Sequence, residues 1–227
     1  MTITWERPGG AVSLGRQAGI GLGAAAAYLI VRGAVSATDG RAQDNARAVA
    51  GLERTLGLAA PHVDNAFVTG VCQWLYTWGH WLAAAAVLVW LARRHPALYY
   101  RARDTLLLCA GAALFVFVVF PVAPPDLGDS PALAALPSLD AGWDVILGLA
   151  IAAAARGVWV RVAGVGAAAL MAGSVIVTGH HYVLDVLAGS GVALVGWLYV
   201  RARRRPRSLR GYAGWDGLNL HKTDINP

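Results

Sequence analysis

Long apolar stretches alternate with short polar segments along most of the chain. Each stretch is close to the ~20 residues that a helix needs to cross the hydrocarbon core of a bilayer. Six can be delimited, over residues 15–36, 66–92, 104–121, 141–156, 158–178 and 181–200. The pattern predicts an all-α integral membrane protein in which residues 1–200 form a single bundle of six transmembrane helices.

Two segments outside these stretches have a different pattern. Residues 43–58 combine charges with Val49, Leu52 and Leu56 at helical spacing, which is typical of an amphipathic helix at a membrane surface. Residues 201–227 are basic and polar, so we expect a tail without fixed structure.

Composition and charge agree with a membrane protein. Of the 227 residues 57% are hydrophobic and only 14% are charged, which is unusual for a soluble domain. The net charge of +6 does not indicate a nucleic-acid partner, because six arginines crowd between Arg201 and Arg210, directly after the last apolar stretch. Such a cluster is typical of a cytoplasmic anchor.

The loop arginines also predict the orientation of the bundle. Most of them fall on one side, which the positive-inside rule makes cytoplasmic: Arg7, Arg16, Arg93, Arg94, Arg101, Arg103, Arg156, Arg161 and the C-terminal cluster. We therefore expect a multi-pass protein of a bacterial-type cell membrane with both termini in the cytoplasm. Residues 37–65, 122–140 and 178–181 then lie on the extracytoplasmic side.

The segment from Thr178 to Gly189 carries the first candidate chemistry. It reads Thr-Gly-His-His-Tyr-Val-Leu-Asp-Val-Leu-Ala-Gly. Its His181 and Asp185 are four residues apart, which stacks an imidazole and a carboxylate on one face of a helix. An ionisable pair in an apolar segment is costly, so it usually marks a functional site. A polar clamp that only holds helices together is the alternative.

Four aspartates form a second candidate site. Asp126 and Asp129 lie in a proline-rich loop, and Asp140 and Asp144 share a face of the next predicted helix. A cation would relieve their repulsion, and carboxylate oxygens suit Mg²⁺, which commonly bridges to a phosphate. All four are candidate magnesium ligands, although solvated loop charges explain Asp126 and Asp129 equally well.

Aromatic residues and a histidine cluster in the second apolar stretch. Aromatic side chains at a membrane interface explain part of this pattern, and a lone buried histidine is most often a hydrogen-bonded core residue. We nevertheless keep a set of candidate substrate-contacting residues, namely His80, Trp78, Trp143, His180 and Tyr182.

Three short segments carry a family pattern: Phe120 to Asp126 with its double proline, Pro137-Ser-Leu-Asp140 with Gly142-Trp143, and His180-His-Tyr182 with Asp185 and Ala188-Gly189. Over roughly residues 45–200 the chain resembles the type 2 phosphatidic acid phosphatase superfamily. The similarity is to the branch of inositol phosphorylceramide synthases and related actinobacterial membrane phosphatases. The resemblance implies a six-helix bundle and a lipid-phosphate substrate at the extracytoplasmic surface. It also implies that His181 is a nucleophile that forms a phosphohistidine and that Asp185 orients it.

Three acids depart from that family pattern. The pattern has a phosphate-binding arginine at the position of Asp126, a histidine that protonates the leaving oxygen at Asp140, and a small residue at Asp144. Two unit charges 4 Å apart interact by about 4 kcal/mol at an effective dielectric of 20, so carboxylates would repel a phosphate. Mg²⁺ held by Asp140 and Asp144 would reverse the sign of this interaction.

These observations leave three functions open. The leading hypothesis is Mg²⁺-dependent cleavage of an isoprenoid diphosphate by a terpene-synthase-like ionisation. In that reaction Trp74, Trp78, Trp81 and Trp143 would stabilise the carbocation. The first alternative is a lipid phosphate phosphatase or phosphotransferase that acts through a phosphohistidine at His181, with Asp140 as the acid. The second is a non-catalytic lipid-binding protein.

Overall fold

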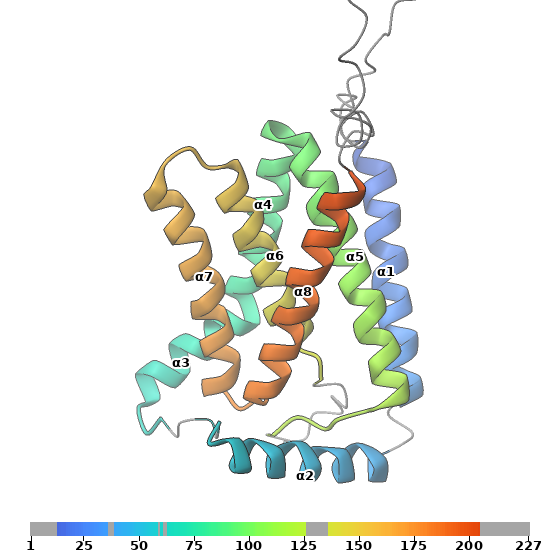
Figure 1. Ribbon diagram of the computed structural model, residues 1–227, viewed down its shortest axis with the longest axis vertical. Coiled ribbons are helices and arrows are strands. Elements are labelled where there is room, and N and C mark those ends of the chain that lie inside the picture. The colour runs from blue at the N-terminus through green and yellow to red at the C-terminus, as the bar shows by residue number, and fades with distance from the viewer. Residues whose placement is uncertain (1–12, 36–38, 59, 61–62, 126–135, 205–227) are drawn as a thin grey trace, which may run out of the picture.

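The computed structural model describes residues 13–35, 39–58, 60, 63–125 and 136–204, which form a bundle of helices (Figure 1). The first half of the chain contains α1 (Leu14–Val35), α2 (Asp39–Leu56), α3 (Ala66–Trp74), the π-helical turn η2 (Leu75–Gly79) and α4 (His80–Arg94). The second half contains α5 (Pro96–Val119), α6 (Leu139–Ala154), α7 (Val158–Val177) and α8 (Val183–Arg203).

All six predicted stretches coincide with helices. Among the described residues, four helical segments are both long and apolar enough to cross a membrane: 66–94, α5, α7 and α8. The chain is therefore an all-α membrane protein, whereas the count of six spans stays a prediction. α5 begins at Pro96, well before the predicted residue 104, because proline fits the first turn of a helix.

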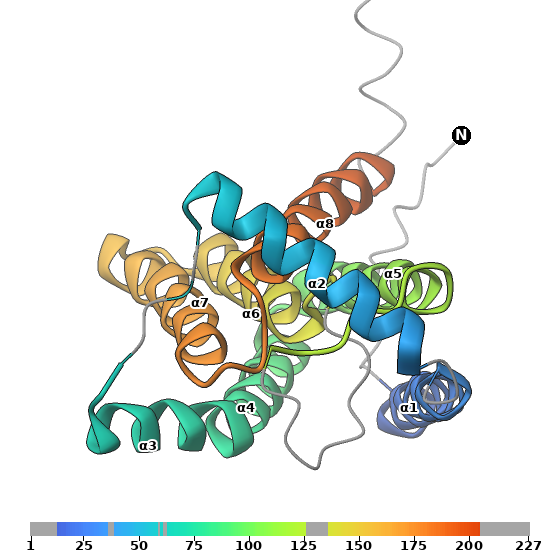
Figure 2. The ribbon, with the colours of Figure 1, turned by 90° about the horizontal axis from the view of Figure 1, so that it is seen from below.

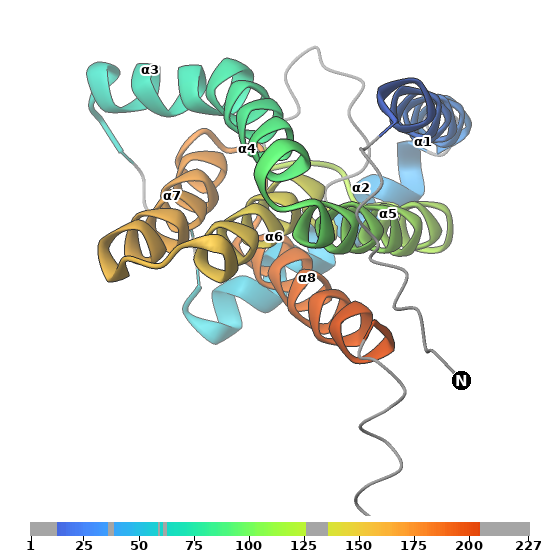
Figure 3. The ribbon, with the colours of Figure 1, turned by 90° about the horizontal axis from the view of Figure 1, so that it is seen from above.

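α6 occupies the centre of the bundle. It packs against α4, α5, α7 and α8, and Figures 2 and 3 show this arrangement from the two ends. Leu91, Ile146 and Trp197 bring α4, α6 and α8 into one apolar core. α1 lies at the edge and packs against α5.

The two ends of the bundle differ in their residues (Figure 1). At one end lie the connection from α4 to α5, the connection from α6 to α7, and the C-terminus of α8. We call this the arginine end, because Arg94, Arg156 and Arg203 lie there. At the other end α7 turns into α8, α6 begins, and α2 lies across the helices, so we call it the α2 end. The grouping of segments matches the one predicted from loop charges.

α2 packs on the bundle through small residues. Ala42, Ala46 and Val49 are buried against Val122 and Ala123. By contrast, Leu52 and Leu56, which the sequence placed on the apolar face, are 50% and 55% exposed. The face of α2 that carries the small alanine side chains packs on the bundle instead, because it can approach Val122 and Ala123 closely. The predicted apolar face thus packs against the protein only at Val49. A role of α2 at the membrane surface stays a prediction.

Candidate active site

The turn between α7 and α8 positions the two histidines of the motif. Gly179 has a φ of 71°, a left-handed conformation that glycine adopts readily, and it reverses the chain. The backbone N–H groups of His180 and His181 then donate to the carbonyl of Val175 at 3.1 and 3.3 Å. His181 is thereby held next to the first turn of α8.

Asp185 lies in that first turn and faces His181. Its Oδ2 accepts a hydrogen bond of 2.9 Å from the N–H of Tyr182, which satisfies a backbone group at the start of α8. The same oxygen lies 3.5 Å from Nδ1 of His181. Asp185 is fully buried, and the bond to Tyr182 holds its carboxylate in place. Nδ1 is therefore the nitrogen of the His181 ring that faces this acid.

Asp140 lies on the other side of His181. The N–H of Ser138 donates to the carbonyl of Asp185 at 3.0 Å, which docks the start of α6 on α8. The Ser138 side chain accepts from the N–H of Ala141 at 3.2 Å and caps α6. Oδ2 of Asp140, in the first turn of α6, then lies 3.7 Å from Nε2 of His181.

The docking of α6 on α8 depends on Gly189. A Cβ atom at this position would overlap the carbonyl oxygen of Ser138. The backbone of Ser138 approaches α8 where Gly189 has no side chain, and Asp140 follows two residues later. Gly189, the last residue of the motif, therefore sets the distance between Asp140 and His181.

His80 joins the same group of side chains from α4. Its Nδ1 donates to Oδ1 of Asp144 at 3.0 Å, and its Nε2 lies 3.9 Å from Oδ1 of Asp140. His80 directly follows η2, and a π-helical turn changes the helical phase of the residues that follow it. His80 is buried, whereas Trp78 and Trp81 on either side of it are exposed.

Five side chains thus alternate between acids and imidazoles. We call them the acid–histidine row. In order along the row they are Asp144, His80, Asp140, His181 and Asp185. Asp140 and Asp144 belong to α6, and His80 belongs to α4. Asp185 belongs to α8, and His181 lies in the turn before it. The row therefore links three helices of the bundle.

The row also determines the charge of His181, which lies between α7 and α8 and outside both spanning helices. Burial lowers the pKa of its imidazole, but the carboxylates of Asp140 and Asp185 outweigh this effect and raise the pKa to about 9. At neutral pH the side chain is therefore an imidazolium, with one N–H towards each acid.

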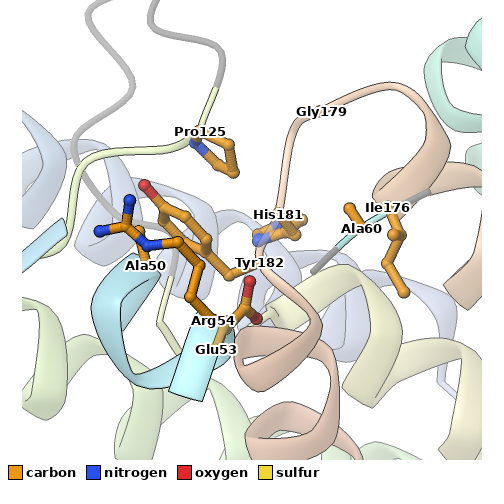
Figure 4. A pocket seen from close by; sticks show the side chains of 9 residues that line it. All are labelled: Ala50, Glu53, Arg54, Ala60, Pro125, Ile176, Gly179, His181 and Tyr182. Atoms are coloured by element: carbon orange, nitrogen blue, oxygen red, sulfur yellow. The ribbon is translucent and has the colours of Figure 1, made fainter. Parts of the chain in front are cut away.

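A cavity of about 240 Å³ lies beside His181 at the α2 end (Figure 4). Tyr182, Ile176 and Pro125 form part of its wall, and α2 contributes Glu53 and Arg54. Oε1 of buried Glu53 accepts a hydrogen bond of 2.7 Å from the N–H of Leu184, which fixes α2 on α8. Arg54 is exposed and brings a permanent positive charge into the cavity that contains His181.

This arrangement agrees with the comparison to known proteins. The model of the PAP2 superfamily matches residues 47–132 and 126–199, which together cover more than half of the chain. The chain belongs to the PAP2 superfamily. No curated protein and no solved structure matches it. Members of the superfamily are phosphatases, so the family indicates a membrane enzyme of the phosphatase or phosphotransferase type and a lipid phosphate as the class of substrate.

The structure brings most of the predicted site residues together. In addition to the acid–histidine row, His180 packs edge-on against Tyr76 with ring centroids 4.2 Å apart, and Tyr182 lines the cavity. Trp143 lies near His80, with ring centroids 6.5 Å apart. Asp126 and Asp129 belong to residues 126–135, which lie outside the described part of this PAP2 chain.

Two of the predicted tryptophans are not at the site. Trp74 and Trp78 are 56% and 62% exposed, because they lie on the outward face of the α3 to α4 segment. Trp81 is also largely exposed, but its ring contacts Trp143 with centroids 6.2 Å apart. Three of the four tryptophans suggested to stabilise a carbocation are thus largely exposed in the described part of the chain.

The predicted magnesium ligands have protein partners of their own. Oδ1 of Asp144 is bound by His80, and Asp140 lies between two imidazoles. In the part of the chain that the structure describes, no group of three or more His, Cys, Asp or Glu side chains is arranged to hold a metal ion. Binding of magnesium at Asp140 and Asp144 stays a prediction.

Two residues of the cavity were not singled out from the sequence. Glu53 and Arg54 belong to the amphipathic segment, where charges are ordinary. Only the way α2 crosses the bundle and hydrogen bonds to Leu184 reveals that they lie at the site. A charged pair on an amphipathic helix gives no separate signal in one sequence.

Proposed function

We propose that this PAP2 protein cleaves the phosphoester bond of a lipid phosphate through a phosphohistidine at His181. The observation that carries the proposal is the position of His181 between Asp185 and Asp140, beside a cavity that also contains Arg54. This arrangement provides a nucleophile, an orienting acid, a proton carrier and a phosphate-binding cation.

The first step forms a bond from Nε2 of His181 to phosphorus and breaks the bond from phosphorus to the lipid oxygen. Nε2 must first lose its proton, and Oδ2 of Asp140, 3.7 Å away, is the acceptor. Asp140 then gives that proton to the departing lipid oxygen, which leaves as an alcohol. Asp185 keeps the remaining Nδ1–H oriented and stabilises the charge on the phosphorylated ring.

The second step regenerates the imidazole. The oxygen of water or of an acceptor alcohol attacks phosphorus, the bond between phosphorus and Nε2 breaks, and Asp140 accepts the proton of the attacking group. Water gives a phosphatase and an alcohol gives a phosphotransferase. The resemblance to the inositol phosphorylceramide synthase branch supports transfer to an alcohol as an alternative to hydrolysis.

Arg54 would bind the phosphate in this scheme. The family pattern has an arginine at the position of Asp126, and this chain instead brings a guanidinium into the cavity from α2. A guanidinium binds phosphate with two parallel hydrogen bonds and stays charged at all relevant pH values. Arg54 therefore offsets the repulsion between the substrate and the carboxylates of the row.

Mg²⁺-assisted cleavage of an isoprenoid diphosphate is the second candidate. One observation favours it: Oδ2 of Asp144 is buried and has no hydrogen-bond partner among the described residues. Because the described side chains alone do not hold a metal ion, substrate oxygens and water would have to complete the coordination of the ion. A chelator distinguishes this candidate from the first.

The site is proposed to face the extracytoplasmic side. The α2 end carries His181, and the opposite end carries arginines that the positive-inside rule assigns to the cytoplasm. A lipid carried in the outer leaflet would then present its phosphate to the cavity while its chains remain in the membrane.

The test uses the full chain purified in detergent. It is incubated with short-chain phosphatidic acid, a polyprenyl phosphate and a polyprenyl diphosphate, with Mg²⁺ or with EDTA, while free phosphate and hydrocarbon products are followed separately. We expect phosphate release or transfer that EDTA does not reduce, no hydrocarbon, and an acid-labile phosphate on the protein that His181→Ala abolishes.

Other results would contradict this proposal in distinct ways. Loss of activity in EDTA together with hydrocarbon products would favour the magnesium reaction. Activity that survives His181→Ala would exclude the phosphohistidine. Lipid binding without turnover of any of these substrates would favour the non-catalytic alternative.

A further inference from the structure

A second cavity lies at the arginine end, on the opposite side of the bundle from His181. Its volume is about 420 Å³, and it is lined by Trp90, Arg94, His95 and Arg156. Arg94 ends α4, His95 joins α4 to α5, and Arg156 follows α6. Three helices therefore meet at this cavity, which we call the basic cavity.

The basic cavity combines positive charges without a compensating acid. Two guanidinium groups and an imidazole line it, and none of its lining residues is acidic. Within the described ranges, neither Arg94 nor Arg156 forms an ion pair, whereas Arg103 and Arg204 both pair with Asp104. Two unpaired guanidinium groups around one cavity favour an anion, and phosphate oxygens match their paired N–H groups.

The position of the cavity favours an amphiphilic anion. The candidate spanning segment 66–94 ends at Arg94, so the cavity lies at the end of an apolar helix. Trp90 is 36% exposed and its ring meets that of His95 at a centroid distance of 5.0 Å. Exposed Val89 adjoins it. Tryptophan at this level is typical of the boundary between acyl chains and headgroups.

We propose that the basic cavity binds the headgroup phosphate of an anionic glycerophospholipid. Arg94 and Arg156 bind the phosphate, and Trp90 packs against the glycerol and the first methylene groups. Basic pockets between helix ends are suited to such headgroups, because the local positive charge and the adjoining apolar surface act on the same molecule. The site is separate from His181, so it does not depend on the proposed reaction.

Binding of a lipid here stabilises the folded protein. α4 carries His80 and α6 carries Asp140 and Asp144, and the bound headgroup connects the far ends of these two helices. A ligand that binds only the folded state raises the melting temperature, and the increase grows with the logarithm of the ligand concentration once this exceeds the Kd. Stability therefore reports binding without any assay of catalysis.

The experiment measures binding to the full chain in detergent by native mass spectrometry and by the shift in melting temperature. The probes are dioctanoyl phosphatidylglycerol, dioctanoyl phosphatidylcholine and inorganic phosphate. We expect phosphatidylglycerol alone to bind measurably and to stabilise the protein. Arg94→Gln and Arg156→Gln should each weaken its affinity roughly tenfold, since each removes a charge-assisted contact with phosphate.

Arg93→Gln is the matched control. Arg93 is exposed on the last turn of α4, next to Arg94, but does not line the cavity. We expect this variant to bind phosphatidylglycerol like the unmodified protein. An equal loss of affinity in Arg93→Gln would mean that the positive charge of this end, and not the cavity, attracts the lipid, which would contradict the proposal. Unchanged affinity in both Arg94→Gln and Arg156→Gln would overturn it. Equal binding of phosphatidylcholine or of inorganic phosphate would overturn it as well.

Discussion

Nδ1 of His80 and Oδ1 of Asp144 form a hydrogen bond of 3.0 Å between α4 and α6, and both side chains are buried. Removal of one partner from a buried ionic pair typically costs roughly 3–5 kcal/mol, because the other is left without compensation. We expect His80→Leu and Asp144→Leu each to lower the melting temperature strongly. The double variant should recover part of the loss, since two apolar side chains can replace a buried pair. If the two losses simply add, the residues are not coupled.

The row also predicts how activity depends on pH. The proposed reaction needs one proton shared by His181 and Asp140, and His181 holds that proton until the pH reaches its pKa of about 9. We expect kcat/KM to be nearly constant at neutral pH and to fall as the pH rises through about 9. Asp185→Asn removes one of the charges that raise this pKa, so the fall should begin at lower pH. Activity that instead increases steadily up to pH 9 would mean that the reaction needs the deprotonated pair.

The same group makes stability depend on pH. The pKa of His181 in the folded protein is raised above its usual value of 6.5. The contribution of its ion pairs to the free energy of unfolding is therefore complete below pH 6.5 and is lost as the pH rises through about 9. Melting temperatures measured between pH 6 and pH 10 should fall over this range in the unmodified protein and less in His181→Gln. Equal slopes would exclude His181 as the group responsible.

Arg54 should act on the substrate rather than on the fold. It is exposed and lines the cavity beside His181, so Arg54→Gln is expected to lower kcat/KM roughly 10- to 100-fold, as for a lost charge-assisted hydrogen bond. Arg54→Lys should restore part of the activity. Arg47→Gln is the control, because Arg47 is exposed on the same helix and pairs with Asp44. An equal effect of Arg47→Gln would point to the charge of α2 as a whole.

Gly189 offers a test of the geometry between α6 and α8. Gly189→Ala places a methyl group on the carbonyl of Ser138, which should displace Asp140 and lower both activity and stability. Overpacking of this kind costs roughly 1–3 kcal/mol. Gly191→Ala is the matched control: a Cβ there meets nothing within 4 Å, so it should leave activity unchanged and stabilise α8 slightly. Normal activity in Gly189→Ala would show that the close approach is not needed.

The sequence was sufficient to predict the helices and part of the site. Apolar runs locate every long helix except the amphipathic α2, since a helix that faces lipid must be apolar along its length. The spacing of His181 and Asp185 requires only the geometry of one helical turn. Asp140 was also predicted to approach His181, but through the family resemblance and not through spacing.

Other parts of the site depend on how separate helices meet. The π-helical turn η2 shifts the helical phase, so that His80 faces Asp144. The spacing of apolar residues around His80 does not indicate this turn. The sequence did not identify His80 as the buried partner of Asp144, and the magnesium ion suggested at Asp144 stays a prediction. The position of Arg54 likewise depends on the crossing of α2, which is fixed by a hydrogen bond between residues 131 positions apart.

The acid–histidine row contains three carboxylates but only two imidazoles. With its three carboxylates ionised, the row has a negative net charge even when both imidazoles are protonated, and Arg54 can at most neutralise it. A phosphate that arrives with two negative charges therefore makes an additional proton on the row or on the substrate favourable. Substrate binding should thus be accompanied by proton uptake from the solvent, and the enzyme would sense the acidity of the compartment that its cavity faces through its affinity for the lipid.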